Sequence, residues 1–426
     1  MSTDTKFEPS LAEVDPQIAD VVRREEVRQS SVLEMIPSEN YASRAVIEAV
    51  GSVLTNKYAE GYPGARYYQG NDIVDEAENL ARDRATALFG MDHANVQPHS
   101  GTQANMAVYL GVIKPGDTVM GMQLDAGGHL THGHSVNASG KLYNFVSYGV
   151  DRETETIDYE AMLELAKEHR PKLIVVGATA YPRQIDFVRA RAIADEVEAV
   201  LMADMAHISG LIAGGAHVSP AGHAQIVTTS THKTLRGPRG GMVLCDQKFA
   251  RRVDRGVFPG SQGGPMMNVI AGKAVMLKEA ATPAFQEYAR QTVENSKVLA
   301  ETLEAAGLRL VSGGTETHLV LVDVTPLGLL GKVAAEALEI AGIVTNYNAI
   351  PFDPQPPTIG SGVRMGTPAL TTRGMGAEEM KQVGGLIARA LEVHEDEAAL
   401  ASIRAEVAEL CEAFPAPALP SSSMAR

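Results

Sequence analysis

The residue types best suited to chemistry in this chain are a lysine and an aspartate, each of which follows an apolar stretch. Lys233 comes after Val-Thr-Thr-Ser-Thr-His, and an amine that loses its hydration there becomes a nucleophile toward an aldehyde. Asp204 ends Val-Leu-Met-Ala-Asp, where a buried carboxylate needs a cationic partner such as a pyridinium nitrogen. Considered alone, such a lysine is more often a surface residue, and such an aspartate equally often caps the next turn.

Two further features could complete a binding site around this pair. Ser100, Gly101 and Thr102 precede a stretch with helical apolar spacing, where hydroxyl and free N–H groups bind phosphate, although a helix cap explains them better when they stand alone. His129 follows paired glycines, which let the backbone approach a ligand while the imidazole stacks on a flat ring. Three histidines here could instead bind a metal, but the glycines favour stacking, and we predict no catalytic metal. Along the chain, the phosphate-binding helix start at residues 100–102 is followed by His129, Asp204 and Lys233. This order predicts a site for pyridoxal 5'-phosphate (PLP).

Short apolar segments alternate with amphipathic ones around these residues, which predicts a parallel sheet with helices on both faces. In such sheets ligands bind at the carboxyl ends of the strands. The predicted strands span residues 118–122, 172–178, 200–206, 226–230 and 241–245. Helices are predicted between them at 158–170 and 188–198.

The 426 residues exceed what one core usually supports, so we expect a large and a small domain. The N-terminal arm should be helical at 15–28 and 43–55, and a long helical region is predicted at 267–307. The predicted division is an N-terminal helical arm at 1–57, a large PLP-binding domain at 58–300, a small C-terminal domain at 301–413 and a flexible tail at 414–426.

Charge and composition narrow the classes of partner. The net charge of −15 argues against nucleic acid, whose phosphates require a basic surface. No apolar run is long enough to span a bilayer, and the polar N-terminus does not resemble a signal peptide, so we expect a cytoplasmic protein without a membrane partner. Two distant cysteines, Cys245 and Cys411, fit a reducing compartment.

From about residue 32 to 391 the chain resembles the serine hydroxymethyltransferases. The likeness rests on several specific motifs, which are Leu-Thr-Asn-Lys-Tyr-Ala-Glu-Gly-Tyr-Pro-Gly, Asn-Val-Gln-Pro-His-Ser-Gly, Gly-Gly-His-Leu-Thr-His-Gly, Thr-His-Lys-Thr-Leu-Arg-Gly-Pro-Arg-Gly-Gly, Phe-Pro-Gly-Ser-Gln-Gly-Gly-Pro and Arg-Met-Gly-Thr-Pro-Ala. The resemblance implies the α/β fold type I of PLP-dependent transferases, with a mostly parallel large sheet and a smaller C-terminal α+β domain. It also implies reversible hydroxymethyl transfer between serine or glycine and tetrahydrofolate, in a homodimer or tetramer with shared active sites.

The same resemblance assigns cofactor-binding roles. Lys233 would bind the cofactor aldehyde, Asp204 would pair with the ring nitrogen, and His129 would stack on the ring. Arg239 would help to order the loop of the lysine. The other cofactor contacts would be Ser100, Gly101, Thr102, Thr179 and His207, with Tyr58 and Gly264 contributed by a second subunit.

Substrate-binding roles follow from the resemblance as well. Arg364 would bind the substrate carboxylate, for which a planar, bidentate cation is well suited. Ser38 and His232 would lie in the amino-acid pocket. The partner chain would provide Glu60 for proton transfer and Tyr68 to orient the substrate, although a salt bridge to Lys57 or Arg66 could also explain Glu60. Folate would lie along Glu60, Tyr67, Leu124, Gly127, Leu130 and Asn348.

A few residues depart from the family pattern. Ala178 and Ser230 are smaller than the usual residues, which leaves open the same chemistry on 2-methylserine and alanine. Tyr347 replaces a common lysine beside Asn348, which leaves open a folate-independent PLP aldolase of 3-hydroxy amino acids. A binding protein without activity is disfavoured, because it would not need the complete set of reactive residues.

Overall fold

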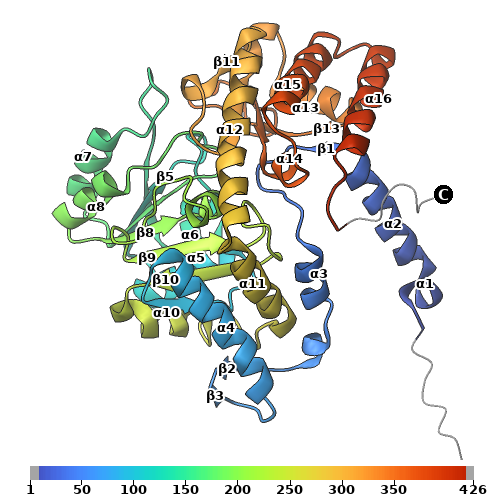
Figure 1. Ribbon diagram of the computed structural model, residues 1–426. Helices are drawn as coiled ribbons and strands as arrows, with labels where there is room; N and C mark the ends of the chain where they lie inside the picture. Colours follow the sequence, from blue (N-terminus) through green and yellow to red (C-terminus); the bar gives the residue numbers. More distant parts are fainter. Residues whose placement is uncertain (1–8, 419–426) are drawn as a thin grey trace, which may run out of the picture.

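A computed structural model describes residues 9–418 of the chain (Figure 1). Its largest element is a seven-stranded sheet, and β10 runs antiparallel to both of its neighbours in an otherwise parallel arrangement. The strand order is β4 (His93–Asn95), β10 (Gly241–Cys245), β9 (Ile226–Ser230), β8 (Val200–Asp204), β7 (Leu173–Gly177), β5 (Thr118–Met122) and β6 (Asn144–Tyr148).

Five strands of this sheet were predicted from the sequence and are confirmed to within two residues at each end, whereas β4 and β6 were not predicted. β4 has three residues, and the side chains of β6 are only partly buried because this strand lies at the sheet edge. Neither strand therefore shows the continuous apolar run that marks a central parallel strand.

Alternate residues of the central strands pack on opposite faces of the large sheet, and together they form its apolar core. In β7, Leu173 and Val175 pack on one face of the sheet, and Ile174 and Val176 pack on the other. This two-residue period places helices on both faces (Figure 1). The helices of this region are α4 (Asp72–Phe89), α5 (Gly101–Val112), α7 (Tyr159–His169), α8 (Phe187–Glu196), α10 (Ala250–Val257) and α11 (Met267–Ala280).

A second apolar cluster forms around a four-stranded antiparallel sheet and the helices that cover it. The sheet order is β11 (Arg309–Leu310), β12 (Leu319–Asp323), β15 (Gly362–Gly366) and β14 (Asn346–Asn348). The accompanying helices are α13 (Gly331–Ile340), α15 (Ala377–Glu392) and α16 (Glu397–Ala413).

The long helix α12 (Pro283–Ala305) belongs to both clusters, as its position between the two sheets indicates (Figure 1). Phe285 near its start packs with the large sheet, and Leu303 near its end packs with the small one. The boundary predicted at residue 300 therefore falls inside a continuous helix. The boundaries at 57, 300 and 413 stay predictions.

The N-terminal arm consists of α1 (Leu11–Val14), α2 (Pro16–Ser31) and α3 (Arg44–Val50). Between α2 and α3, β1 (Leu33–Glu34) pairs in parallel with β13 (Ile343–Val344), and Leu33 is fully buried in the second cluster. Of the tail predicted at 414–426, residues 419–426 lie outside the described part, and Ala416 is buried. No helix within residues 9–418 has the length and apolar character to cross a membrane.

One buried guanidinium group joins the arm to the C-terminal segment. Arg373 donates hydrogen bonds to the carbonyl oxygens of Ser30 (3.1 Å) and Val32 (2.9 Å). It also donates to the carbonyl oxygens of Cys411 (2.9 Å) and Phe414 (2.6 Å). The arm and the C-terminal segment are therefore held by the same side chain.

Replacing Arg373 by methionine should lower the free energy of unfolding by about 2–4 kcal/mol, because several buried carbonyl groups lose a charged donor. Urea unfolding followed by circular dichroism measures this change. Arg389→Met is the control, since Arg389 pairs with Glu406 on the surface and its loss should cost under about 1 kcal/mol. Equal losses in the two variants would contradict this role for Arg373.

Candidate active site

The carboxyl ends of the central strands meet the start of α5 at one cavity of about 370 Å³. Asp204 is the last residue of β8, and Lys233 follows β9 by three residues. The sequence prediction that strand ends bring these side chains together is confirmed. The lining residues are Ser38, Glu39, Ser100, Gly101, Thr102, Asn105, His129, Ala178, Thr179, Asp204, Ala206, His207, Ser230, His232, Lys233 and Arg239.

Lys233 lines this cavity and is partly buried, and this burial lowers the pKa of its amine to about 8, with the nearby charges of Arg364 and Arg239 acting in the same direction. The carboxylate of Asp204 opposes this shift and favours the ammonium form. A large fraction of the amine is therefore neutral near pH 8, which is the form that attacks an aldehyde carbon.

Asp204 stays ionised although it is buried. Burial by itself would raise its pKa, but hydrogen bonds from His132 and Asn105, together with the charge that His132 and His129 carry when protonated, lower the pKa below its usual value. The amide of Asn105 donates to Oδ2 over 2.8 Å, and the backbone N–H of Ala206 donates to Oδ1 over 3.1 Å. A fixed, buried anion of this kind suits a pyridinium nitrogen.

The structure gives His132 a role that the sequence did not reveal. The backbone N–H of His129 donates to Nδ1 of His132 over 3.2 Å, so this nitrogen carries no proton. The proton is then on Nε2, which donates to Oδ2 of Asp204 over 3.1 Å. The spacing of three residues between the two histidines was visible in the sequence, but it suggested only a metal site as an alternative.

His129 has the burial and charge state that ring stacking requires. Burial lowers the pKa of its imidazole to about 4, so the ring is neutral at physiological pH. Its Nδ1 lies 2.7 Å from the hydroxyl of Thr131, which fixes the ring orientation at the cavity wall. A neutral, oriented ring can lie against a flat cofactor without adding a charge.

The start of α5 provides the anion-binding end of the cavity. Ser100 is the N-cap residue, and its side chain accepts a hydrogen bond from the backbone N–H of Gln103 over 3.2 Å. Gly101 and Thr102 occupy the first turn, whose N–H groups have no partner within the helix. The predicted phosphate residues therefore lie together on the same cavity as Lys233 and Asp204.

Two buried ring nitrogens of residues that line the cavity have no hydrogen-bond partner within residues 9–418. They are Nε2 of His207 and Nδ1 of His232, and burial lowers the pKa of His232 to about 3. Buried polar atoms without partners are costly, so a polar ligand is needed to satisfy them. Together with the lysine, the acid and the helix start, these atoms fit a phosphorylated pyridine aldehyde.

Arg364 lies on β15 and does not itself line this cavity, but it contacts the backbone of Thr179, which does. Its guanidinium donates to the carbonyl oxygen of Thr179 over 2.7 Å and to the side chain of Asn346 over 3.1 Å. Burial lowers its pKa to about 10, and the group remains charged at neutral pH. Among the described residues no carboxylate pairs with it.

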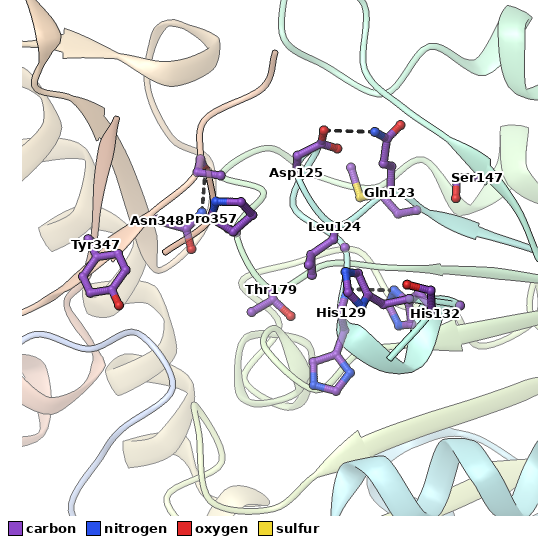
Figure 2. A pocket seen from close by; sticks show the side chains of 17 residues that line it. Gln123, Leu124, Asp125, His129, His132, Ser147, Thr179, Tyr347, Asn348 and Pro357 are labelled. Carbon is purple, nitrogen blue, oxygen red and sulfur yellow. Dashed lines mark hydrogen bonds between the residues drawn. The ribbon is translucent and has the colours of Figure 1, made fainter. Parts of the chain in front are cut away.

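A larger cavity of about 500 Å³ adjoins the first, and His129 and Thr179 line both (Figure 2). Of the residues expected to bind folate, Leu124 and Asn348 line this second cavity together with Tyr347. Gly127 and Leu130 do not line it. Gly127 instead shapes its wall, because its carbonyl oxygen accepts from the N–H of Thr179 over 2.7 Å.

Four further predicted residues form a separate group, defined here as the tyrosine cluster: Tyr58, Glu60, Tyr68 and Gly264. The two tyrosines are exposed, whereas Glu60 and Gly264 are partly buried. The hydroxyl of Tyr58 donates to Oε1 of Glu60 over 3.2 Å, and the rings of Tyr58 and Tyr68 lie 5.2 Å apart. Gly264 lies against the ring of Tyr58. None of the four residues lines the cavity of Lys233 within the same chain.

The alternative explanation of Glu60 as a salt-bridge residue is not supported. Lys57 donates to the backbone carbonyls of Tyr58 and Gln69, and Arg66 pairs with Asp75 and Glu78. Tyr67, expected at the folate, is 71% exposed and packs edge-on against Phe258, also outside both cavities. These exposed groups are therefore available to another molecule.

The fold and the cavity are those of the PLP-dependent enzymes of fold type I. The chain belongs to the serine hydroxymethyltransferase family, whose model matches residues 11–387. It is 60% identical over 406 residues to the serine hydroxymethyltransferase of Myxococcus xanthus (strain DK1622), which covers 95% of this chain and 97% of the relative. It is 58% identical over 410 residues to that of Koribacter versatilis (strain Ellin345), covering 96% of each.

Lys233 should capture aldehydes with a midpoint near pH 8, because only its neutral amine reacts and its pKa is about 8. The rate of the absorbance change after PLP is added to the apoprotein should rise with pH and level off above that value. Asp204→Asn should move the midpoint to lower pH, since it removes the charge that favours the ammonium form. A midpoint near the ordinary lysine value of 10.5 would overturn this assignment.

Proposed function

We propose that the chain catalyses reversible transfer of a hydroxymethyl unit between serine, glycine and tetrahydrofolate. PLP would occupy the cavity of about 370 Å³, and folate would occupy the adjoining cavity of about 500 Å³. The observation that carries the proposal is the shared wall of His129 and Thr179, which brings an amino-acid site next to a site for a larger flat molecule (Figure 2). The names of the two relatives support the same reaction.

Bound PLP withdraws electrons from a breaking bond at the amino-acid Cα, and the protein selects the bond by orientation. Lys233 would hold the aldehyde carbon, Asp204 would keep the ring nitrogen protonated, and His129 would cover one ring face. Ser100, Gly101 and Thr102 would hold the phosphate, and His207 and Thr179 would lie near the ring hydroxyl.

Arg364 supports the proposal on the substrate side. Its buried guanidinium group lacks an acidic partner within the described residues and is anchored next to Thr179, so a substrate carboxylate would supply the missing anion. Ser38 and His232 line the cavity of Lys233 and would contact the amino acid there. Serine and glycine both carry the required carboxylate.

The tyrosine cluster supports a shared active site. The side chain of Tyr58 is 54% exposed and that of Tyr68 is 48% exposed. This exposure within one chain leaves both side chains free to contact the cofactor and the substrate of another subunit. We propose that a second subunit receives this cluster, so that Glu60 of one chain moves a proton at the substrate bound by Lys233 of the other. The assembly is then a homodimer, or a tetramer that consists of two such dimers. Free, buried cysteines agree with a cytoplasmic location, which we also propose.

The two alternatives left open by the sequence receive no added support. Ala178 and Ser230 do line the lysine cavity, but nothing in its shape selects a methyl group on Cα. Tyr347 lines the folate cavity beside Asn348, a position from which its ring could stack on folate instead of excluding it (Figure 2). Serine and folate therefore remain the proposed substrates.

The purified holoenzyme should form glycine from L-serine only when tetrahydrofolate is present, and Lys233→Ala should abolish the reaction. Amino-acid analysis with and without folate measures this directly. Both enantiomers of 2-methylserine and a 3-hydroxy amino acid should be turned over more slowly than L-serine. Faster turnover of 2-methylserine, or serine cleavage that ignores folate, would replace the proposed reaction by the corresponding alternative.

Two inactive variants should restore activity when their subunits are exchanged. A hybrid dimer of Lys233→Ala and Glu60→Gln chains contains one site with both native residues, so about a quarter of the native activity should return after mixing and dissociation. Lys233→Ala mixed with Asp204→Asn is the control, because these residues line one cavity of one chain. Activity in the control, or none in the first mixture, would contradict a site shared between subunits.

A further inference from the structure

Lys273 on α11 is a fully buried lysine that the proposed reaction does not use. Its ammonium group donates to the carbonyl oxygens of Val96 (2.7 Å), Pro98 (2.9 Å) and Gly241 (2.8 Å). An ammonium group has three N–H donors and a neutral amine has two, so the charged form matches these three acceptors.

The three carbonyls belong to the backbone that leads into the phosphate-binding end of the cavity. Pro98 lies two residues before Ser100, and its carbonyl also accepts from the N–H of Gly241 over 2.9 Å. The backbone of Gly241 in turn lies against the carbonyl oxygen of Ser100, so closely that a Cβ on Gly241 would clash with it. A shift of Lys273 would therefore move the start of α5.

Gln262 holds the same segment from another side. Its amide donates to the carbonyl oxygen of Gln97 over 3.0 Å, and its side-chain oxygen accepts from the N–H of His99 over 3.0 Å. Side chains from residues 262 and 273 thus bind successive backbone groups of residues 96–99. Because β4 ends at Asn95, the segment is held by these two side chains and by the backbone hydrogen bond from Gly241 of β10.

The charge of Lys273 has no direct counterion within residues 9–418. Glu78 favours the charged form, but its own carboxylate is bound by Arg66 (2.6 Å) and by Gln97 (2.9 Å). Burial lowers the pKa of Lys273 to about 7. The positive charge of Lys273 also adds to burial in lowering the pKa of His99, the residue before Ser100, so its field reaches the phosphate end.

We propose that Lys273 is a positioning residue for the cofactor phosphate, which fixes the backbone before Ser100 and adds a positive charge behind the helix start. A dianionic phosphate near Ser100 then compensates a buried cation that carbonyl dipoles alone stabilise incompletely. The inference rests on the proposed placement of the phosphate at Ser100, Gly101 and Thr102.

The test compares PLP with pyridoxal, which has the same ring and aldehyde but no phosphate. Dissociation constants of both for the full-length apoprotein are measured by absorbance titration. Lys273→Met should weaken PLP binding by about tenfold or more and pyridoxal binding by less than about twofold. Only PLP has a phosphate group whose charge would interact with the charge of Lys273. Lys278→Met is the matched control, since Lys278 lies exposed on the same helix.

A second variant covers the possibility that Lys273→Met does not fold. A Cβ at Gly240 would come within 2.6 Å of Cε of Lys273, so Gly240→Ala displaces the flexible lysine without removing its charge. It should weaken PLP binding relative to pyridoxal in the same sense. The inference would be overturned if the ratio of the two dissociation constants were the same in the folded variants as in the native protein. Equal weakening of PLP binding and pyridoxal binding is one such result. Failure of the native protein to bind PLP would instead refute the proposed function itself.

Discussion

The active site depends on keeping one amine dehydrated while a nearby carboxylate stays charged. Lys233 follows the end of β9 and is partly buried, and Asp204 is buried at the end of β8, where Asn105, His132 and a backbone N–H stabilise its charge. Parallel strands deliver both groups to one edge, where they line the same cavity. The helices on both faces of the large sheet hold the strands, and therefore these two residues, in place.

Residues around the pair are oriented by further contacts of the same kind. The amide oxygen of Asn105 accepts from the hydroxyl of Thr228 over 2.6 Å, which directs its nitrogen toward Asp204. Nδ1 of His207 lies 3.3 Å from Nε2 of His318, and His318 directly precedes β12 of the small sheet. Asn105 and His207 thus contribute oriented, uncharged groups to the cavity wall.

The sequence predicted the parts of the site that strand ends determine. Apolar runs located β8 and β9, which was enough to assign Asp204 and Lys233 to one cavity, and the motif Gly-Gly-His placed His129 there. It did not predict His132, Asn105, His318 or Lys273 as supporting residues. Each of these acts through a partner far away in the chain or through a backbone group, and such contacts leave no local pattern. The edge strand β6 was missed for a related reason, since partial burial weakens its apolar signal.

The pairing of β1 with β13 has a consequence for biosynthesis. Leu33 leaves the ribosome early, yet its place in the second cluster requires Ile343 and residues of α16, which are made much later. The large sheet is complete once β10 has emerged, so it can form while the N-terminal arm still waits for its partners. A segment synthesised early is therefore among the last to find its final position, and a chaperone that shields Leu33 and Met35 would act during that interval.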